Sequence, residues 1–454
     1  MSARMRRVAV GALAAVGVLL SGCTQLVDGV GSYSSGLSDV PNADTPIHGT
    51  NHGSIDKIAG NAIADIQQFW TQQMPQVFGK PYRPVTAFFS VDPDGGRPAP
   101  CTETASDIRG NAFYCPSQDI VAWDRKVLFP DLAKRFGPFL IAMVLAHEWG
   151  HVIQRRSTLP SSRTIVLETQ ADCYAGSWTA SALGGGAPHF QIERQNLDSA
   201  LAGYLLFRDP VGAQSDDRQA HGSGFDRISA FQEGYDKGPK HCTTYGDGRV
   251  FTEIPFYDPR DQARQGNLPY AQTVERGPAD IEDYWSRSFE PTFGKKWTPA
   301  PKVHPFDGDA NRPSCDGAKV NDVQYCPGDD TIYFDRRYSI RTVYDKTGDF
   351  GPISLIAVAF GQAARKRMGL SVNGDRALTG SICLAGAYAG DVFNRRPAPD
   401  TTLLSPGDLD EAIQALLEFA GREGFFEATG TVDTVGFERV DFFRRGFADI
   451  RSCS

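Results

Sequence analysis

Apolar residues along the chain fall into long runs that predict helices and short runs that predict strands. Residues 139–145 are seven consecutive apolar residues, so the helix that contains them is expected to be buried. Helices next to a small sheet predict an α+β fold. The predicted helices span residues 54–75, 132–156, 165–181 and 192–207, and the predicted strands span residues 85–91 and 111–123.

The same succession of residues occurs a second time farther along the chain, in the same order and with nearly the same spacing. Two copies are too few for a solenoid, so we expect two domains of one fold at residues 53–250 and 273–454. Residues 251–272, rich in Pro, Asp, Arg and Gln, are expected to link them. The clearest matches are Tyr-Cys-Pro at 114–116 and 325–327, Phe-Gly-Pro at 136–138 and 350–352, and Cys-x-Ala-Gly at 173–176 and 383–386.

The first residues of the chain predict export. Arginines precede the apolar residues 8–20, a run that is too short to span a bilayer comfortably. Residues 20–23, Leu-Ser-Gly-Cys, resemble a bacterial lipobox, which implies removal of residues 1–22 and a lipid on the sulfur of Cys23. A plain secretory signal in which Cys23 is incidental is the alternative.

Residues 23–52 are rich in Gly, Ser, Asp and Asn and show no hydrophobic period. They predict a flexible tether between lipid and fold, with an ordered loop packed on the domain as the alternative. The expected location is the extracytoplasmic face of a bacterial cell membrane, which the protein contacts through its lipid anchor.

The net charge of the chain bears on its possible partners, and the cysteine content bears on its disulfides. The chain of 454 residues has a formal net charge of -8 and no block of Lys and Arg, which argues against a nucleic-acid partner. Of nine cysteines, eight remain if Cys23 carries a lipid, and an even number in an exported chain predicts disulfides. Matching positions in the two copies predict the pairs Cys101–Cys115, Cys173–Cys242, Cys315–Cys326 and Cys383–Cys453.

Candidate chemistry begins where the apolar run of the buried helix ends. His147 and His151 are four positions apart, so they share a helical face, and Glu148 lies beside them. This His-Glu-x-x-His arrangement supplies two zinc ligands and a carboxylate that can take a proton from the attacking water. Two helical histidines without a metal are the alternative.

A catalytic zinc site needs a third protein ligand. Glu168 and Asp172 share a helical face among small or apolar neighbours, which favours a packed helix over a solvated acidic face. We expect Glu168 to be the third ligand and Asp172 to accept a hydrogen bond from the second ring nitrogen of a ligating histidine. One Zn²⁺ per chain, in the first domain, is the expected cofactor.

The second copy keeps the Gly, Cys and aromatic framework but loses these polar residues together. We therefore expect it to be a degenerate copy that cannot assemble the zinc site. The five polar positions of the first copy are matched, in chain order, by Gly361, Gln362, Arg365, Leu378 and Ile382.

The same comparison points to His221, because the aligned position of the second copy is Asp433. The one histidine of that copy, His304, lies in a Pro-rich stretch far from the matching positions. A hydrolase of this kind needs a donor that stabilises the oxyanion, and His221 is our candidate. Asp216 and Asp217 also lack counterparts and are candidates to orient it. A loop histidine without a chemical role is the alternative.

A substrate role is expected for Asn111 and Ala112, which begin the strand before the active helix. An edge strand at this place can pair with the backbone of a peptide. The alternative is a strand that only carries Cys115.

Three separated motifs in this order resemble the bacterial neutral zinc metallopeptidase family. They are residues 147–154, residues 167–176, and residues 221–223 with Arg227, and the resemblance covers about residues 58–242. It implies a zincin-like fold, zinc on His147, His151 and Glu168, and Glu148 as general base. The degenerate second copy departs from the single-domain pattern of the family.

Together these features predict a zinc-dependent peptidase anchored at the cell envelope that hydrolyses a peptide or protein substrate. A non-catalytic envelope binding or scaffold lipoprotein derived from the same fold is the alternative. For the second copy we expect substrate docking or shielding of the active cleft.

Overall fold

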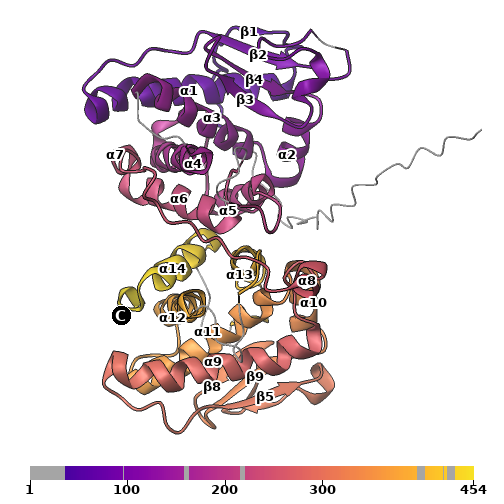
Figure 1. Cartoon of the computed structure of the whole chain (residues 1–454), viewed down its shortest axis with the longest axis vertical. Helices are drawn as coiled ribbons and strands as arrows, with labels where there is room; N and C mark the ends of the chain where they lie inside the picture. Colours follow the sequence, from indigo (N-terminus) through magenta and orange to yellow (C-terminus); the bar gives the residue numbers. More distant parts are fainter. Residues whose placement is uncertain are drawn as a thin grey trace, which may run out of the picture.

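The computed structural model describes residues 36–95, 97–157, 163–214, 220–395, 404–422, 424–426 and 435–453. Cys23, Asp216 and Asp217 lie outside these residues. The described chain forms two helix-rich halves, each with a small sheet at its outer end and helices toward the junction (Figure 1). This is a mixed α+β architecture.

The first half places one sheet beside a bundle of helices that share one apolar core. Its strands are β1 (Ile47–His48), β2 (Ala87–Val91), β3 (Ala112–Cys115) and β4 (Ile120–Asp124). Its helices are α1 (Ser54–Phe78), α2 (Leu128–Phe136), α3 (Phe139–Ser157), α4 (Thr164–Ser181), α5 (Arg194–Tyr204), α6 (Gly224–Lys237) and α7 (Pro239–Cys242).

The sheet has the strand order β1-β2-β4-β3, so β3 is an edge strand. β2 runs parallel to β4, whereas β3 runs antiparallel to it and pairs Ala112 with Trp123 and Tyr114 with Val121. The region predicted as one strand at residues 111–123 is thus a hairpin of two strands. Asp119 and its neighbours make the turn, with Asp119 at a positive φ of 56°.

The buried helix predicted at residues 132–156 is divided into α2 and α3. Gly137 has a φ of 88° and caps α2, and Pro138 follows it. Proline has no N–H group for the helical ladder and disfavours the helical conformation of the residue before it, so the chain turns here. The turn aims α3, which carries the histidines, separately from α2.

Part of the predicted tether is folded. Residues 36–52 lie against the first half, where β1 pairs with β2 and the side chain of Asn61 accepts a hydrogen bond from the Ala43 N–H at 2.8 Å. The Thr45 hydroxyl also donates to the Gly60 carbonyl at 2.8 Å. Specific polar partners on α1 hold this segment although its own sequence has no apolar period.

The second half has its own core and a similar series of elements. The segment expected to be a linker contains α8 (Pro259–Ala263) and the start of α9 (Tyr270–Phe293). The strands that follow are β5 (Lys302–Phe306), β6 (Ser314–Cys315), β7 (Ala318–Lys319), β8 (Val323–Cys326) and β9 (Thr331–Asp335). The helices are α10 (Ser339–Thr347), α11 (Phe350–Met368), α12 (Asp375–Asn394), α13 (Asp408–Glu418) and α14 (Gly436–Ala448).

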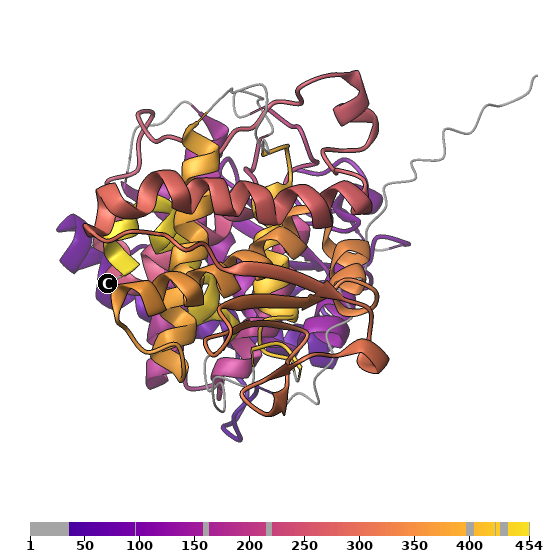
Figure 2. The ribbon, with the colours of Figure 1, turned by 90° about the horizontal axis from the view of Figure 1, so that it is seen from below.

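Strands β5, β9 and β8 of the second half pair in the same directions and register as β2, β4 and β3 of the first half. β5 runs parallel to β9, and β8 runs antiparallel to it, pairing Val323 with Phe334 and Tyr325 with Ile332. These are the positions that the repeat aligns with the pairs of β3 and β4. Figure 2 shows this second sheet from below, with α9 crossing the molecule beside it.

Glycines bring matching helices together in both halves. A Cβ atom on Gly150 of α3 would lie 2.4 Å from the Ala171 Cα of α4, and one on Gly361 of α11 would lie 2.5 Å from the Ser381 carbonyl oxygen of α12. Only a residue without a side chain permits such close approach. In the first half this approach sets Glu168 on α4 opposite the histidines of α3.

The junction between the halves is reciprocal. Asp410 of α13 accepts a hydrogen bond from the Phe225 N–H at the start of α6 at 2.8 Å. Asp198 of α5 accepts one from the Phe437 N–H at the start of α14, also at 2.8 Å. The side chain of Phe437 belongs to the core of the first half, whereas that of Phe225 belongs to the core of the second.

Four disulfides are present, in the four pairs that the repeat indicates. Two of them tie α4 to α7 and α12 to the end of the chain. The bonds join Cys101 to Cys115, Cys173 to Cys242, Cys315 to Cys326 and Cys383 to Cys453.

None of the helices in the described ranges has both the length and the apolar composition needed to cross a membrane.

Candidate metal centre

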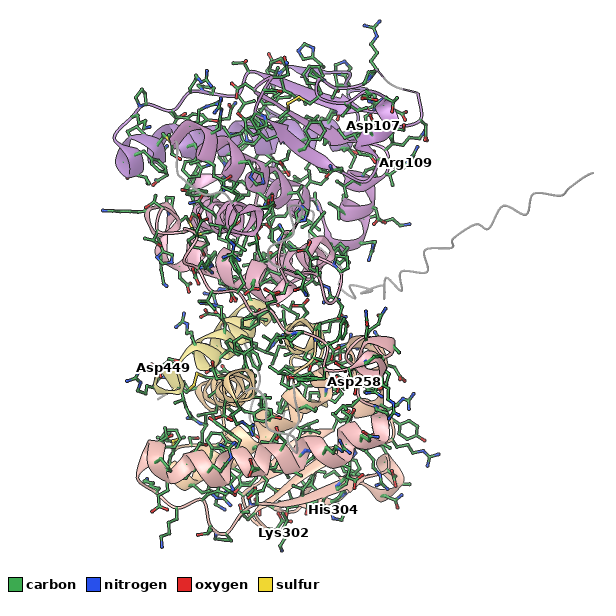
Figure 3. All side chains as sticks on the ribbon, in the orientation of Figure 1. Asp107, Arg109, Asp258, Lys302, His304 and Asp449 are labelled. Carbon is green, nitrogen blue, oxygen red and sulfur yellow. A yellow bond between two sulfur atoms is a disulfide. The ribbon has the colours of Figure 1, made fainter. Side chains whose placement is uncertain are left out.

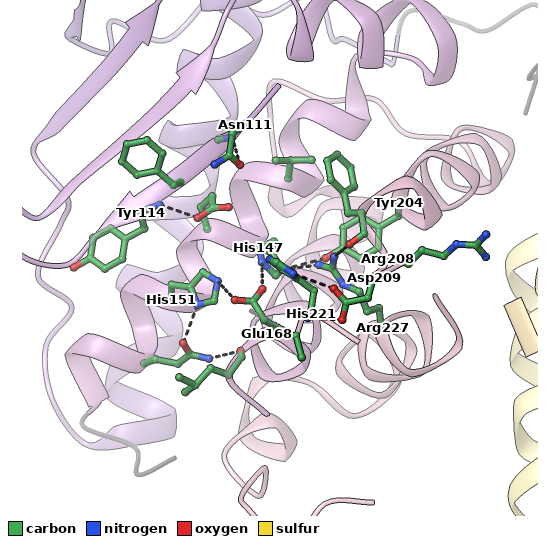
Figure 4. A pocket seen from close by; sticks show the side chains of 18 of the residues that line it. Asn111, Tyr114, His147, His151, Glu168, Tyr204, Arg208, Asp209, His221 and Arg227 are labelled. Carbon is green, nitrogen blue, oxygen red and sulfur yellow. Dashed lines mark hydrogen bonds and ion pairs between the residues drawn. The ribbon is translucent and has the colours of Figure 1, made fainter. Parts of the chain in front are cut away.

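A cavity of about 1050 Å³ opens between β3, α3, α4 and the loop after α5. Figure 4 shows its polar side chains converging from these elements. The residues with expected roles that line it are Asn111, Ala112, His147, Glu148, His151, Glu168 and His221. Asp172 lies behind them and is fully buried.

The two histidines and Glu168 form a compact donor set. The Nε2 atom of His147 lies 3.2 Å from the Glu168 Oε2 atom, and the Nε2 atom of His151 lies 3.5 Å from the Glu168 Oε1 atom. One donor atom from each residue lies within 4.8 Å of the others. The histidine spacing on α3 and the close packing of α4 therefore bring three donors to one point.

The other ring nitrogen of each histidine has a partner. The Nδ1 atom of His147 is 2.7 Å from the Asp172 Oδ1 atom, and the Nδ1 atom of His151 is 3.0 Å from the Gln154 Oε1 atom. An oxygen acceptor at Nδ1 fixes the tautomer that leaves the Nε2 lone pair free for a metal. Gln154 is itself held, because its amide donates to the Leu167 carbonyl at 2.6 Å.

Asp172 is held ionised by Arg227 of α6. The Arg227 guanidinium donates to both carboxylate oxygens of Asp172, at 2.8 and 2.9 Å. Burial opposes the charge of Asp172, but Arg227 and His147 lower its pKa to about 2. The hydroxyl of Tyr204 also donates to Asp172. A buried, fully hydrogen-bonded carboxylate is thus fixed behind His147.

The donor set fits zinc. Two imidazoles and one carboxylate are the ligands of many catalytic zinc sites. The site also favours positive charge: burial alone would lower the pKa of His147, but Asp172 and Glu168 raise it to about 10. Carboxylates that stabilise an imidazolium at this point also stabilise a bound cation.

Glu148 lies next to this centre and faces the edge strand. Its Oε2 atom accepts a hydrogen bond from the Tyr114 N–H of β3 at 2.8 Å. Burial raises the pKa of Glu148, while His147 and His151 oppose this. The side chain of Glu148 is therefore a fixed carboxylate whose affinity for a proton exceeds that of an exposed one.

On its cavity side β3 has no neighbouring strand among the described residues. Tyr114 donates its N–H to Glu148, and the Ala112 N–H contacts the Asn111 side chain at 2.9 Å, so both groups point away from β4. In the second half the matching edge is covered: the Asp322 N–H donates to the Gly424 carbonyl at 2.7 Å, and Val323 forms a parallel bridge with Phe425.

His221 is oriented by Asp209, a residue that the sequence did not single out. Asp209 accepts hydrogen bonds from the His221 N–H at 2.7 Å and lies 3.3 Å from the His221 Nδ1 atom. The hydrogen bond to Asp209 raises the pKa of His221. The imidazole is about half exposed, with 49% of the side chain accessible, at the rim of the cavity.

The second half contains no imidazole at the matching positions. Gln362, which takes the place of Glu148, accepts a hydrogen bond from the Tyr325 N–H at 3.3 Å, so the contact between helix and edge strand persists. Arg365 fills the place of His151 and donates to the Ser371 carbonyl. Figure 3 labels His304 at the far end of this half, remote from the cavity.

Gln154, Tyr204 and Asp209 are the functional candidates that sequence reasoning missed. Gln154 was within reach, because it lies three positions after His151 on the same helix. Tyr204 and Asp209 reach the site only through the path of the chain after α5.

Comparison with known proteins gives a consistent result. The family model described as "Putative neutral zinc metallopeptidase" matches residues 8–245. The chain is 28% identical over 222 residues to "Uncharacterized protein YpfJ" of Escherichia coli (strain K12), an alignment that covers 43% of this chain and 73% of that protein. No solved structure matches.

A mycobacterial relative is similar over a shorter region. "Uncharacterized protein Rv2575" of Mycobacterium tuberculosis is 28% identical over 171 residues, which cover 32% of this chain and 58% of that protein. The names of these two relatives state no activity.

Proposed function

Because this chain belongs to the neutral zinc metallopeptidase family, whose model covers residues 8–245, we propose that it is a zinc-dependent peptidase with its active centre in the first half. The observation that supports this most strongly is the convergence of His147, His151 and Glu168. The Nε2 atoms of both histidines face Glu168, and their Nδ1 atoms are held by Asp172 and Gln154.

In this proposal His147, His151 and Glu168 hold one zinc ion. Zinc bound there would supply a Lewis acid for the peptide carbonyl and for a water molecule. Asp172, with Arg227 and Tyr204 around it, keeps the His147 ring in place. Such outer hydrogen bonds orient ligands and commonly contribute about 10–100-fold to metal affinity or activity.

Glu148 is the proposed general base. The Tyr114 N–H fixes the carboxylate beside the donor set, and burial raises its pKa. A carboxylate with increased proton affinity can take a proton from the attacking water and return it to the leaving amine. This is the role that its place in the motif indicates.

The open edge of β3 is the proposed docking site for the substrate backbone, through Asn111 and Ala112. The second half supports this by analogy. There the edge that matches β3 is bridged by residues 424–425 of the same chain, so the backbone of another segment contacts this edge. In the first half the cavity, not another segment of the described chain, lies along the edge of β3.

His221 is the proposed donor to the oxyanion. Asp209 is an ionised acceptor whose pKa is lowered by its contacts with His221 and Gly222, in opposition to burial. The His221 Nδ1 atom therefore carries a proton, and the outward Nε2 atom donates a hydrogen bond only when the ring is charged. The raised pKa of His221 favours that charged form.

The second half is proposed to be a degenerate copy of the same zincin-like fold. Equal sheet register, matching glycine contacts and the persistent bond between Tyr325 and Gln362 support this origin. Its α13 and α14 contact α5 and α6, which carry Tyr204 and Arg227. The position of the second half therefore favours a supporting role, in which it holds α5 and α6 in place. Substrate docking or shielding of the cleft by the second half stays a prediction.

We place the protein at the extracytoplasmic face of the cell membrane, held by a lipid on Cys23. The proposal rests on the lipobox-like residues 20–23. In cells given labelled palmitate, the wild type should incorporate label and Cys23→Ser should not. Equal labelling of the two proteins would contradict the proposal that Cys23 carries the lipid.

The proposed activity is tested with a proteome-derived peptide library. Protein containing one zinc per chain should cleave peptides internally or at a terminus, and the same protein stripped of zinc should not until zinc is restored. A zinc-loaded, folded protein that cleaves nothing in such a library would favour the envelope scaffold instead. The cleavage sites would also define the specificity.

A further inference from the structure

A second cluster of possible cation ligands lies in the second half, close to the junction. Asp349 at the start of α11 and Asp408 and Glu411 at the start of α13 each place a carboxylate oxygen within 4.8 Å of the others. Their exposed fractions are 3%, 2% and 7%. Asp261 of α8, 6% exposed, lies beside them and accepts a hydrogen bond from Ser405.

Backbone N–H groups anchor each carboxylate through one oxygen. Asp349 accepts from the Leu268 N–H at 2.9 Å, Asp408 from the Ser405 N–H at 2.7 Å, and Glu411 from the Phe350 N–H at 2.8 Å. The side chains are therefore held in position before any ligand arrives.

Two of the remaining oxygens have no partner among the described residues. The Oδ1 atoms of Asp349 and Asp408 are buried and accept no hydrogen bond from any group in the described ranges. Leaving a buried carboxylate oxygen unsatisfied is costly unless something pairs with it. Within the described ranges, no Lys, Arg or His forms an ion pair with any of the four acids.

The pKa values of the acids in the cluster also indicate that their negative charges are not balanced. Burial, and then the charge of Asp261, raises the pKa of Asp349 to about 7. Burial and the neighbouring acids raise the pKa of Asp408. Burial with Asp349 raises the pKa of Glu411, and Arg208 opposes this without outweighing it. Several buried acids that repel each other need either protons or a cation.

We propose that Asp349, Asp408 and Glu411 bind a calcium ion, with Asp261 at the edge of the site. The donors are oxygen atoms alone, which favours a hard cation over zinc. Calcium accepts carboxylate and amide oxygens in irregular geometry. The amide oxygen of Asn267 lies nearby, where it accepts the Asp349 N–H at 2.9 Å. Because Gly348 has no side chain, two of these oxygens can lie against it: a Cβ there would lie 2.0 Å from Glu411 Oε1 and 2.4 Å from the amide oxygen of Asn267.

Calcium at this point would join three segments that are distant in sequence. Asp261 and Asn267 belong to the connection between the halves, Asp349 to the start of α11, and Asp408 to the start of α13. The next acid of α13, Asp410, holds Arg208 at 2.9 Å and the first turn of α6. The ion is thus a structural support for the junction, separate from the zinc centre.

The test uses the whole chain, stripped of metal on a chelating resin and then reloaded with one zinc per chain. Addition of CaCl₂ should raise the melting temperature, and equilibrium dialysis with radioactive calcium should give one calcium per chain. Asp408→Asn should abolish both the shift and the binding, while zinc content stays at one per chain. Asp226→Asn, which changes another buried acid with a raised pKa, should keep both.

The sign of the stability change separates this proposal from a cluster that is merely protonated. In a cluster that is protonated, Asp408→Asn replaces a carboxyl whose pKa is raised, so at neutral pH it should raise the melting temperature with or without calcium. With calcium, the same variant should melt below the wild type when calcium is present. A variant that is stabilised in calcium, or a wild type that neither binds calcium nor responds to it, would overturn the proposal.

Discussion

At the scale of single residues, the charge of His221 depends on one neighbour. Asp209 binds both the backbone N–H and the Nδ1 side of His221, so the ring offers a proton to the cavity only in its charged form. The hydrogen bond that the His221 ring donates to Asp209 raises the pKa of His221 above its usual value. The charged form therefore persists at higher pH and is lost as the pH rises through the raised pKa.

Asp209→Asn should move the alkaline limb of kcat/KM to lower pH, because the neutral amide no longer stabilises the imidazolium. His221→Gln should lower kcat by about 10²–10³-fold, the usual cost of losing one oxyanion donor. The measurement is a pH–rate profile on a cleaved peptide, with zinc content determined for each variant. An alkaline limb that stays in place in Asp209→Asn would mean that His221 does not set it.

Residues of the proposed zinc centre could be predicted from the sequence for a physical reason. His147 and His151, and Glu168 and Asp172, are pairs at helical spacing, and each pair shares a face whatever the rest of the fold. The structure brings both pairs together at the cavity. Asp209 instead reaches His221 through a loop, and nothing local in the sequence marks such a contact.

At the scale of elements, two glycines offer a matched experiment. Gly150 and Gly361 each allow two helices to touch, and a Cβ on either would lie within 2.5 Å of the opposing backbone. Gly150→Ala and Gly361→Ala should each lower the free energy of unfolding by roughly 1–3 kcal/mol, as overpacked cores do.

The two variants should differ in zinc binding. Only Gly150→Ala moves α4, and hence Glu168, relative to the histidines of α3. Competition with a chromophoric chelator should therefore show weaker zinc binding for Gly150→Ala and unchanged binding for Gly361→Ala. Equal zinc affinity in both variants, despite equal loss of stability, would argue against the proposed ligand set.

Element boundaries were the least predictable feature. Periodicity joined α2 to α3 because it does not register the turn at Gly137 and Pro138. Residues 36–52 were expected to be a tether because they show no hydrophobic period, yet hydrogen bonds to Asn61 and Gly60 hold part of them. Long-range polar partners of this kind are not visible in a local pattern.

At the scale of the whole molecule, the junction resembles the interface of a two-fold dimer. Asp198 holds the start of α14, and Asp410, at the matching position of the second half, holds the start of α6. In a two-fold interface, residue i of one subunit meets residue j of the other and the reverse. The repeat predicted two similar halves, but it did not indicate which faces meet.

The exchange of aromatic side chains between the two cores predicts cooperative unfolding. Phe437 lies in the first core and Phe225 in the second, so neither core is complete without the other half. Differential scanning calorimetry of the disulfide-bonded protein should give one transition. Asp198→Ala and Asp410→Ala should each shift that single transition to lower temperature, and two well-separated transitions in the wild type would show that the halves unfold independently.

The central claim is that Glu148 acts as the base of a zinc peptidase. The most direct measurement compares kcat/KM of the wild type and of Glu148→Gln on one peptide that the wild type cleaves, in preparations that each contain one zinc per chain. The glutamine keeps the hydrogen bond from the Tyr114 N–H, as Gln362 does with Tyr325, but cannot take a proton. We predict a loss of at least about 10²-fold with zinc retained, and hydrolysis at the wild-type rate by the zinc-loaded variant would contradict the mechanism.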